Sequence, residues 1–143
     1  MSDQVDLRIG LSATSWEYRY PEAKVYIDDI LIFDNQVTDK QDIEWSGELV
    51  EGSHKLIIEL HNKLDSDTVT DDDGNIINDV LLNIDEVEID NIELEYLKYS
   101  CGIYYPNNPN APDKLDHCVN LGWNGKWELE FTAPTYLWFL ENL

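Results

Sequence analysis

Hydrophobic and polar residues alternate along most of this chain, which is the pattern of β-strands with one face against a core. The alternation and further short apolar runs lie at residues 5–13, 25–32, 43–45, 52–60, 80–94, 97–105 and 127–131. Turn signals lie between and within these runs. Asp28–Asp29 indicates a tight hairpin, and we expect Gly47 to end a strand. The pattern predicts an all-β fold over residues 1–143, a single antiparallel β-sandwich of jelly-roll type.

The segment at residues 80–94 changes phase twice. Val80, Leu82 and Ile84 share one parity, and Val87 and Ile89 share the other. A shift of one residue turns every following side chain to the opposite face of a sheet. We therefore expect β-bulges or bends near residues 85 and 90.

The chain ends in an apolar run, YLWFLENL, at residues 136–143. With fewer than ten residues after Pro134, we predict a final strand in preference to a helix, and we predict no amphipathic helix elsewhere. The run is too apolar to stay exposed on a soluble monomer. It either completes the core as an edge strand or packs on a partner, such as another copy of the chain in a homo-oligomer.

An acidic loop follows the strand predicted at residues 52–60, and no Lys or Arg occurs from residue 65 to residue 97. Oxygen ligands crowd the loop, and calcium takes six to eight of them. The candidate metal ligands are Asn62, Asp65, Asp67, Asp71, Asp73, Asn75 and Asp79. The loop is not an EF-hand, because valines occupy the first and last ligand positions. The alternative is a solvated acidic loop with a turn at residues 71–75.

Several aromatic side chains are candidates for stacking against a sugar ring. They are Trp16, Tyr18, Tyr20, Tyr104, Tyr105 and Trp123. The alternative is that they fill the core or a subunit contact, where aromatic residues are common.

The net charge of -21 excludes some classes of partner. Nucleic-acid binding needs Lys and Arg to displace counterions, so none is expected, and anionic membranes are equally disfavoured. The first residues lack the basic start and apolar core of a signal peptide, and no segment is apolar enough to insert into a membrane. Synthesis in a reducing cytoplasm favours free thiols at Cys101 and Cys118, although their spacing leaves a disulfide open.

No catalytic motif emerges from the sequence. The serines lack the glycines of a nucleophile elbow, and His117 beside Cys118 is adjacency in sequence rather than in space. Histidine and cysteine spacing does not match a zinc site. We therefore predict that the protein is not an enzyme.

Two segments, SHKLIIELHNK at residues 53–63 and DVLLNIDEVEID at residues 79–90, resemble the calcium-dependent xylan-binding modules. These modules are small β-sandwiches in which a strand ends near Asn-Asp and a later Asp-Arg-Asn-Leu enters the next strand. The resemblance implies roles for Asn62 and Asp79. Lys63 stands where that family has a metal-binding Asp, and Val80 and Leu81 replace its Arg-Asn pair.

A broader resemblance extends over nearly the whole chain. The KVYIDD hairpin, GSHKLIIEL and the ending LGWNGKWELEFTAPTYLWFLENL are similar to small proteins of T4-like, marine tailed bacteriophages. This implies a non-catalytic virion structural or accessory protein, made in the bacterial host cytoplasm and located on the capsid, neck or tail beside other virion proteins. The alternative function is a calcium-dependent glycan-binding module that attaches to the host surface.

Overall fold

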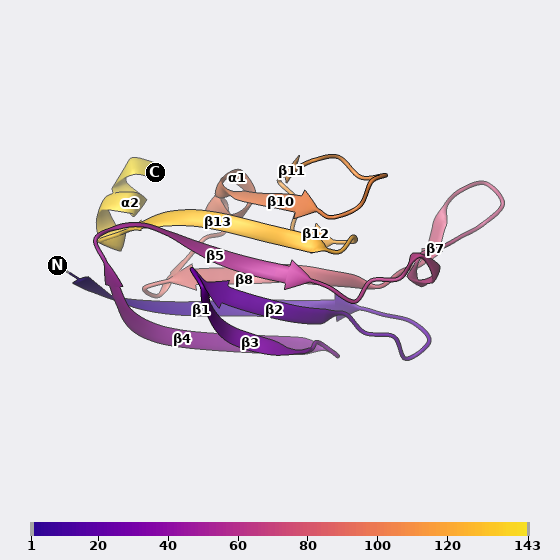
Figure 1. The fold of residues 1–143 in the computed structure, drawn as a ribbon, viewed down its shortest axis with the longest axis horizontal. Coiled ribbons are helices and arrows are strands. Elements are labelled where there is room, and N and C mark those ends of the chain that lie inside the picture. The colour runs from indigo at the N-terminus through magenta and orange to yellow at the C-terminus, as the bar shows by residue number, and fades with distance from the viewer. Residues whose placement is uncertain (1, 143) are drawn as a thin grey trace.

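A computed structural model describes residues 2–142 of the protein as two antiparallel sheets packed face to face (Figure 1). The first sheet has the spatial order β12 (Asn120–Leu121), β8 (Leu81–Ile89), β1 (Ser2–Thr14) and β4 (Lys40–Val50), with β9 (Ile92–Glu93) paired to β8. The second has the order β11 (Leu115–Asp116), β10 (Gly102–Pro106), β13 (Gly125–Ala133), β5 (Gly52–Leu60), β2 (Glu22–Ile27) and β3 (Ile30–Gln36). The predicted all-β sandwich is confirmed.

Alternate side chains from both sheets form one core. Ile9 of β1, Ile58 of β5 and Trp127 of β13 are fully buried, as the alternating pattern predicts. Burying an aliphatic side chain such as that of Ile9 or Ile58 stabilises the fold by about 1.5–3 kcal/mol relative to leaving it exposed. The core therefore lies between the sheets, and the outer faces carry the charge.

The two ends of the sandwich differ in construction. The described termini, the β4–β5 connection and the C-terminal helix lie together at one end in Figure 1. The connections at residues 15–21, 61–80 and 107–124 lie at the other end. We call these the closed end and the loop end.

The predicted phase change near residue 85 is a β-bulge. Gly10 of β1 pairs with Glu86, whereas the next residue, Leu11, pairs with Ile84. Asp85 is thus the extra residue, and the bulge lets Ile84 and Val87 both face the core. The second predicted bend, at Asp90, is the turn from β8 into β9.

The Asp28–Asp29 hairpin is confirmed as the turn between β2 and β3. The prediction that Gly47 ends a strand is wrong, because β4 continues to Val50. The indole of Trp45 explains the glycine, since a Cβ at Gly47 would lie 2.5 Å from its Cζ2 atom. Gly47 makes room for a side chain within the strand.

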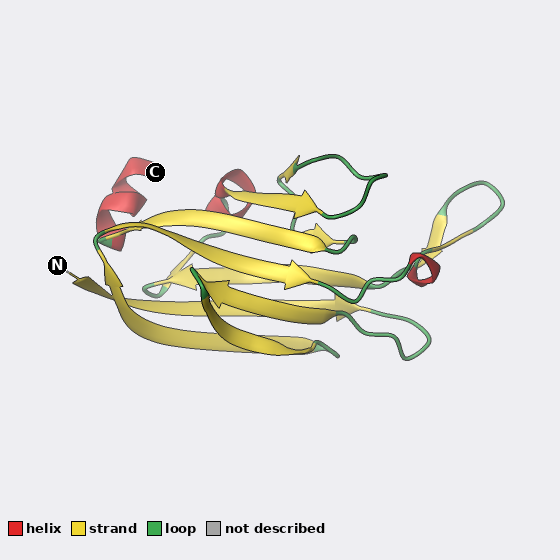
Figure 2. Cartoon of the chain, viewed as in Figure 1, coloured by secondary structure: helices red, strands yellow, loops and turns green. Residues whose placement is uncertain are grey.

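The predicted final strand is instead a helix, α2 (Thr135–Asn142) (Figure 2). Its buried residues, Thr135, Trp138 and Phe139, follow helical spacing. Trp138 packs edge-on against Phe131 of β13, with ring centroids 6.4 Å apart. The apolar run therefore divides between a face that completes the core and an exposed face with Tyr136 and Leu140.

Residues 97–105 are also not one strand, because α1 (Leu97–Cys101) precedes β10. The Nζ atom of Lys98 donates to the Asp85 carbonyl at 2.6 Å, which ties α1 to the bulge.

Cys101 and Cys118 are free thiols. None of the helices within residues 2–142 is long and apolar enough to cross a membrane.

Candidate functional site

The loop end brings together most of the residues that the sequence singles out. The connection at residues 61–80 contains a 3₁₀ turn at Asp65–Asp67 and the small hairpin β6 (Val69–Thr70) and β7 (Ile76–Asn78). In Figure 1 this hairpin projects from the end of the sandwich.

Arg19 forms a bidentate ion pair with Asp67 at one side of the loop end. Its Nε and terminal nitrogen donate to the two Asp67 carboxylate oxygens at 2.9 and 2.8 Å, and the same terminal nitrogen donates to the Asn62 carbonyl at 2.6 Å. Asp67 is 2% exposed. The hydrogen bonds from Arg19, helped by the Leu64 N–H, lower the pKa of the Asp67 carboxyl despite its burial. Asp67 is therefore an ionised partner of a fixed guanidinium.

Lys63 organises the other side through Asp79. Its Nζ donates to Asp79 Oδ1 at 2.7 Å and to the Val80 carbonyl at 2.8 Å. The side chains of Lys63 and Asp79 are 8% and 15% exposed. The Thr68 hydroxyl also donates to Asp79 Oδ1, at 2.7 Å. The ion pair thus joins the start and the end of the long loop.

The remaining candidate ligands are dispersed. Asp71 Oδ1 accepts from the N–H groups of Asp73 and Asn75, both at 2.9 Å, in the exposed turn between β6 and β7. The hydrogen bonds, foremost that from the Asn75 N–H, lower the pKa of Asp71. Asn62 uses its side-chain oxygen to accept from the Glu22 N–H and its amide to donate to the Tyr20 carbonyl. Asp65 is exposed on the 3₁₀ turn.

The seven candidate ligands do not form one calcium coordination sphere. Two of them, Asp67 and Asp79, are paired with protein cations, and Asn62 is engaged by the backbone. Within residues 2–142, no three His, Cys, Asp or Glu side chains lie close enough together to hold a metal ion. Asp67 and Asp79 do not fit a calcium site, because a guanidinium and an ammonium group already neutralise these two carboxylates.

The six stacking candidates have different environments. Tyr104 is fully buried, and its hydroxyl donates to the Trp123 carbonyl and accepts from the Trp123 N–H, so its ring faces no solvent. Burial raises the pKa of the Tyr104 hydroxyl. Trp16 is half-buried and donates from Nε1 to the Asp67 carbonyl at 2.6 Å. Tyr18 is 92% exposed.

Tyr20 is half-buried beside the Asn62 amide that its carbonyl accepts from. Tyr105 and Trp123 instead line two adjoining clefts, of about 370 and 300 Å³ respectively. Asn107 and Asn124 line both clefts, and the Asn107 N–H donates to the Asn124 carbonyl at 2.6 Å. We call the two clefts and this divide the asparagine groove.

Several residues give the asparagine groove polar walls that the sequence analysis missed. His61, Lys126, Glu59 and Glu128 line the larger cleft. Gly125 allows the close approach of β10 and β13 at its floor, since a Cβ there would lie 2.4 Å from the Tyr105 carbonyl oxygen. An Asn-Gly pair such as Asn124–Gly125 is a turn signal in a sequence, but it does not reveal that Asn124 lies next to Asn107.

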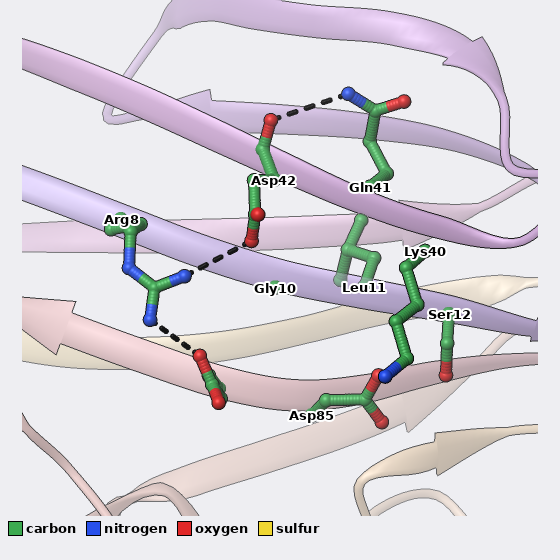
Figure 3. A pocket seen from close by; sticks show the side chains of 9 residues that line it. Arg8, Gly10, Leu11, Ser12, Lys40, Gln41, Asp42 and Asp85 are labelled. Carbon is green, nitrogen blue, oxygen red and sulfur yellow. Dashed lines mark hydrogen bonds and ion pairs between the residues drawn. The ribbon is translucent and has the colours of Figure 1, made fainter.

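Another cavity, of about 650 Å³, lies elsewhere, on the outer face of the first sheet (Figure 3). Arg8 lines it and donates to Glu88 at 2.7 Å, to Asp42 at 3.0 Å and to Glu86. The hydrogen bonds from Arg8 to Glu88 and Glu86 raise the pKa of the guanidinium. Lys40 extends across the cavity, and no aromatic residue lines it. The cavity is polar and has no stacking surface.

No protein-family model matches the chain, and no curated protein matches it. Two solved structures do. The complex of vCBM60 with galactobiose superposes with a TM-score of 0.55 at 6% identity, over 87% of this chain and 96% of that one.

The second is a selenomethionine form of vCBM60, described with a circular permutation that links two families of calcium-dependent carbohydrate binding modules. It gives a TM-score of 0.58 at 9% identity, over 87% of this chain and 89% of that one. At these identities the likeness concerns the fold alone. The chain has the β-sandwich fold of a carbohydrate-binding module.

Proposed function

We propose that the protein is a non-catalytic glycan-binding module and that the asparagine groove receives the sugar. The observation that supports this most strongly is the likeness of the fold to vCBM60 over 87% of the chain. That protein was solved with galactobiose, a disaccharide. The proposal transfers the class of ligand, a short glycan, and not the particular sugar.

The chemistry of the asparagine groove suits a polyhydroxylated ligand. Tyr105 is 41% exposed and offers a ring face for the apolar side of a sugar. The Asn107 side chain carries both a donor and an acceptor, which match the dual character of sugar hydroxyls. Lys126 and Glu128 add a donor and an acceptor on the same strand, β13.

The roles of the two asparagines differ. Asn124 is a positioning residue, because its side chain accepts from the Lys63 N–H at 2.7 Å and donates to the Lys63 carbonyl at 3.1 Å. Asn107 is exposed. A sugar would therefore contact Asn107 and Tyr105 while Asn124 holds the wall of the groove.

A glycan array followed by calorimetry with the hits tests this proposal. Tyr105→Ala and Asn107→Ala should each weaken binding about tenfold, which corresponds to about 1.4 kcal/mol. Tyr136→Ala is the matched control, since Tyr136 is 64% exposed on α2 at the closed end. A blank array, or equal affinities for Tyr105→Ala and the control, would contradict the proposal.

The virion location, the bacteriophage relationship and the partnership with other virion proteins stay predictions from the sequence resemblance, as does a homo-oligomer. Mass spectrometry of purified particles checks the location, and absence of the protein from the particle would contradict it. A glycan-binding module on a particle surface would serve attachment to a host glycan. The two proposals are compatible but independent.

A further inference from the structure

The ammonium of Lys63 is buried and contacts two oxygen atoms. It lies 2.7 Å from Asp79 Oδ1 and 2.8 Å from the Val80 carbonyl oxygen, and its side chain is 8% exposed. A buried ammonium is costly unless it is paired and hydrogen-bonded. These contacts meet that requirement and fix the ammonium at one position.

The surrounding contacts converge on the same point. Asp79 Oδ1 also accepts from the Thr68 hydroxyl at 2.7 Å and from the Val80 N–H at 2.9 Å. The main chain of Lys63 is held on both sides by the Asn124 amide. The ion pair therefore joins the two ends of the 61–80 connection, and the Asn124 hydrogen bonds attach Lys63 to the turn before β13.

A structural metal ion would play the same role in an acidic loop. A structural cation holds carboxylate and carbonyl oxygens together, and here the Lys63 ammonium binds one of each, Asp79 Oδ1 and the Val80 carbonyl oxygen. Arg19 acts similarly on Asp67 and on the Asn62 carbonyl. The loop end of the sandwich thus supplies its own cations, from Lys63 and from Arg19, although calcium-dependent modules share the fold.

We propose that the Lys63 ammonium takes the structural place of a metal ion, so that the loop end is ordered, and binds its ligand, without calcium. A divalent cation at Asp79 would have to displace or repel the ammonium. The part of this proposal that concerns a ligand rests on the proposed glycan-binding function. The part that concerns the loop does not.

Thermal unfolding and calorimetry in calcium chloride and in EGTA test the proposal on the full chain. The wild-type protein should have the same Tm in both and show no stoichiometric heat with calcium. Lys63→Met should lower Tm by roughly 10 °C, because it leaves Asp79 buried without its cation. Lys55→Met is the matched control, since Lys55 pairs with Glu128 while 51% exposed, and its loss should change Tm by about 2 °C or less.

Lys63→Asp adds a positive test. A carboxylate and a Ca–O distance of about 2.4 Å together span roughly the length of the lysine stem. The variant should be destabilised in EGTA and should regain Tm in calcium, whereas Lys63→Met should not respond. A calcium-dependent Tm in the wild type, a Lys63→Met variant as stable as Lys55→Met, or a Lys63→Asp variant indifferent to calcium would overturn the proposal.

These outcomes are separate from those of the glycan experiment. A wild-type protein that ignores calcium but binds no glycan contradicts the proposed function and leaves the role of Lys63 standing. A protein that binds glycan only with calcium contradicts the role of Lys63 and leaves glycan binding standing.

Discussion

His54 Nδ1 lies 2.7 Å from Asp28 Oδ2, and this contact ties strand β5 to the turn between β2 and β3. The other ring nitrogen, Nε2, lies 2.7 Å from the Val50 carbonyl oxygen. The imidazole is 8% exposed. Two acceptors face two ring nitrogens, so the doubly protonated ring satisfies both of them.

This geometry predicts a dependence of stability on pH. Burial works to lower the pKa of His54, but the Val50 carbonyl and Asp28 outweigh it and raise that pKa. A raised pKa in the folded state contributes stability at low pH that is lost as pH rises through the folded value. We expect the free energy of unfolding to fall as pH rises above about 6.5, the ordinary pKa of histidine. Chemical denaturation at a series of pH values measures the fall.

His54→Gln should remove that part of the pH dependence, since glutamine does not titrate. His117→Gln is the control, because His117 is an exposed histidine in the 107–124 connection. An unchanged slope in His54→Gln would contradict the assignment.

The pair of Arg19 and Asp67 predicts both a loss of stability and a response to acid. Arg19→Met should destabilise the protein by about 2–3 kcal/mol, because it leaves a buried carboxylate without its charged donor. Because the pKa of Asp67 is lowered, its contribution exists above the unfolded value and is lost as pH falls through the folded one. The wild type should therefore lose stability below about pH 4 more steeply than Arg19→Met. Parallel slopes would contradict this account.

Gly102 predicts a packing defect. A Cβ there would lie 2.2 Å from Trp127 Cζ2 and 2.6 Å from the Lys98 carbonyl oxygen. Gly102→Ala should lower the free energy of unfolding by about 1–3 kcal/mol through overpacking. Gly122→Ala is the control, since its Cβ would meet only the flexible end of Leu81 at 3.2 Å. Equal stabilities would contradict the packing account.

The C-terminal helix α2 should behave as part of the core. Trp138 is 5% exposed, whereas Leu140 on the same helix is 66% exposed. Trp138→Ala should cost about 3–5 kcal/mol, and Leu140→Ala should cost less than about 1 kcal/mol. Urea denaturation measures both, and a mild effect at Trp138 would show that α2 is not needed for folding.

The alternation of apolar residues predicted the long strands and the sandwich well, because most of these strands have one face on the core. The irregularity at Asp85 was predictable for the same reason, since a change of parity requires a bulge or a bend. α2 was missed although Thr135, Trp138 and Phe139 carry a helical spacing. An apolar run of eight residues fits a strand equally well until its packing partner, Phe131, is known.

The loop end was predicted only in part. The concentration of acidic residues was evident, but the cations that neutralise Asp67 and Asp79 lie 48 and 16 positions away along the chain. Only the fold brings Arg19 to Asp67. The sequence showed that Lys63 stands where the calcium-dependent xylan-binding modules have a metal-binding Asp. The role of Lys63 depends on the position of its ammonium group, which only the fold determines.

The separation of a closed end from a loop end determines how the protein can present itself. The described termini both lie at the closed end, and the asparagine groove lies toward the other, between the connections there and the adjoining parts of β5, β10 and β13 (Figure 1). Whatever is joined to either terminus, whether a neighbouring domain or a solid support, is held away from the groove by the length of the strands. A tethered copy would therefore face outward, with its groove open to large or surface-bound glycans.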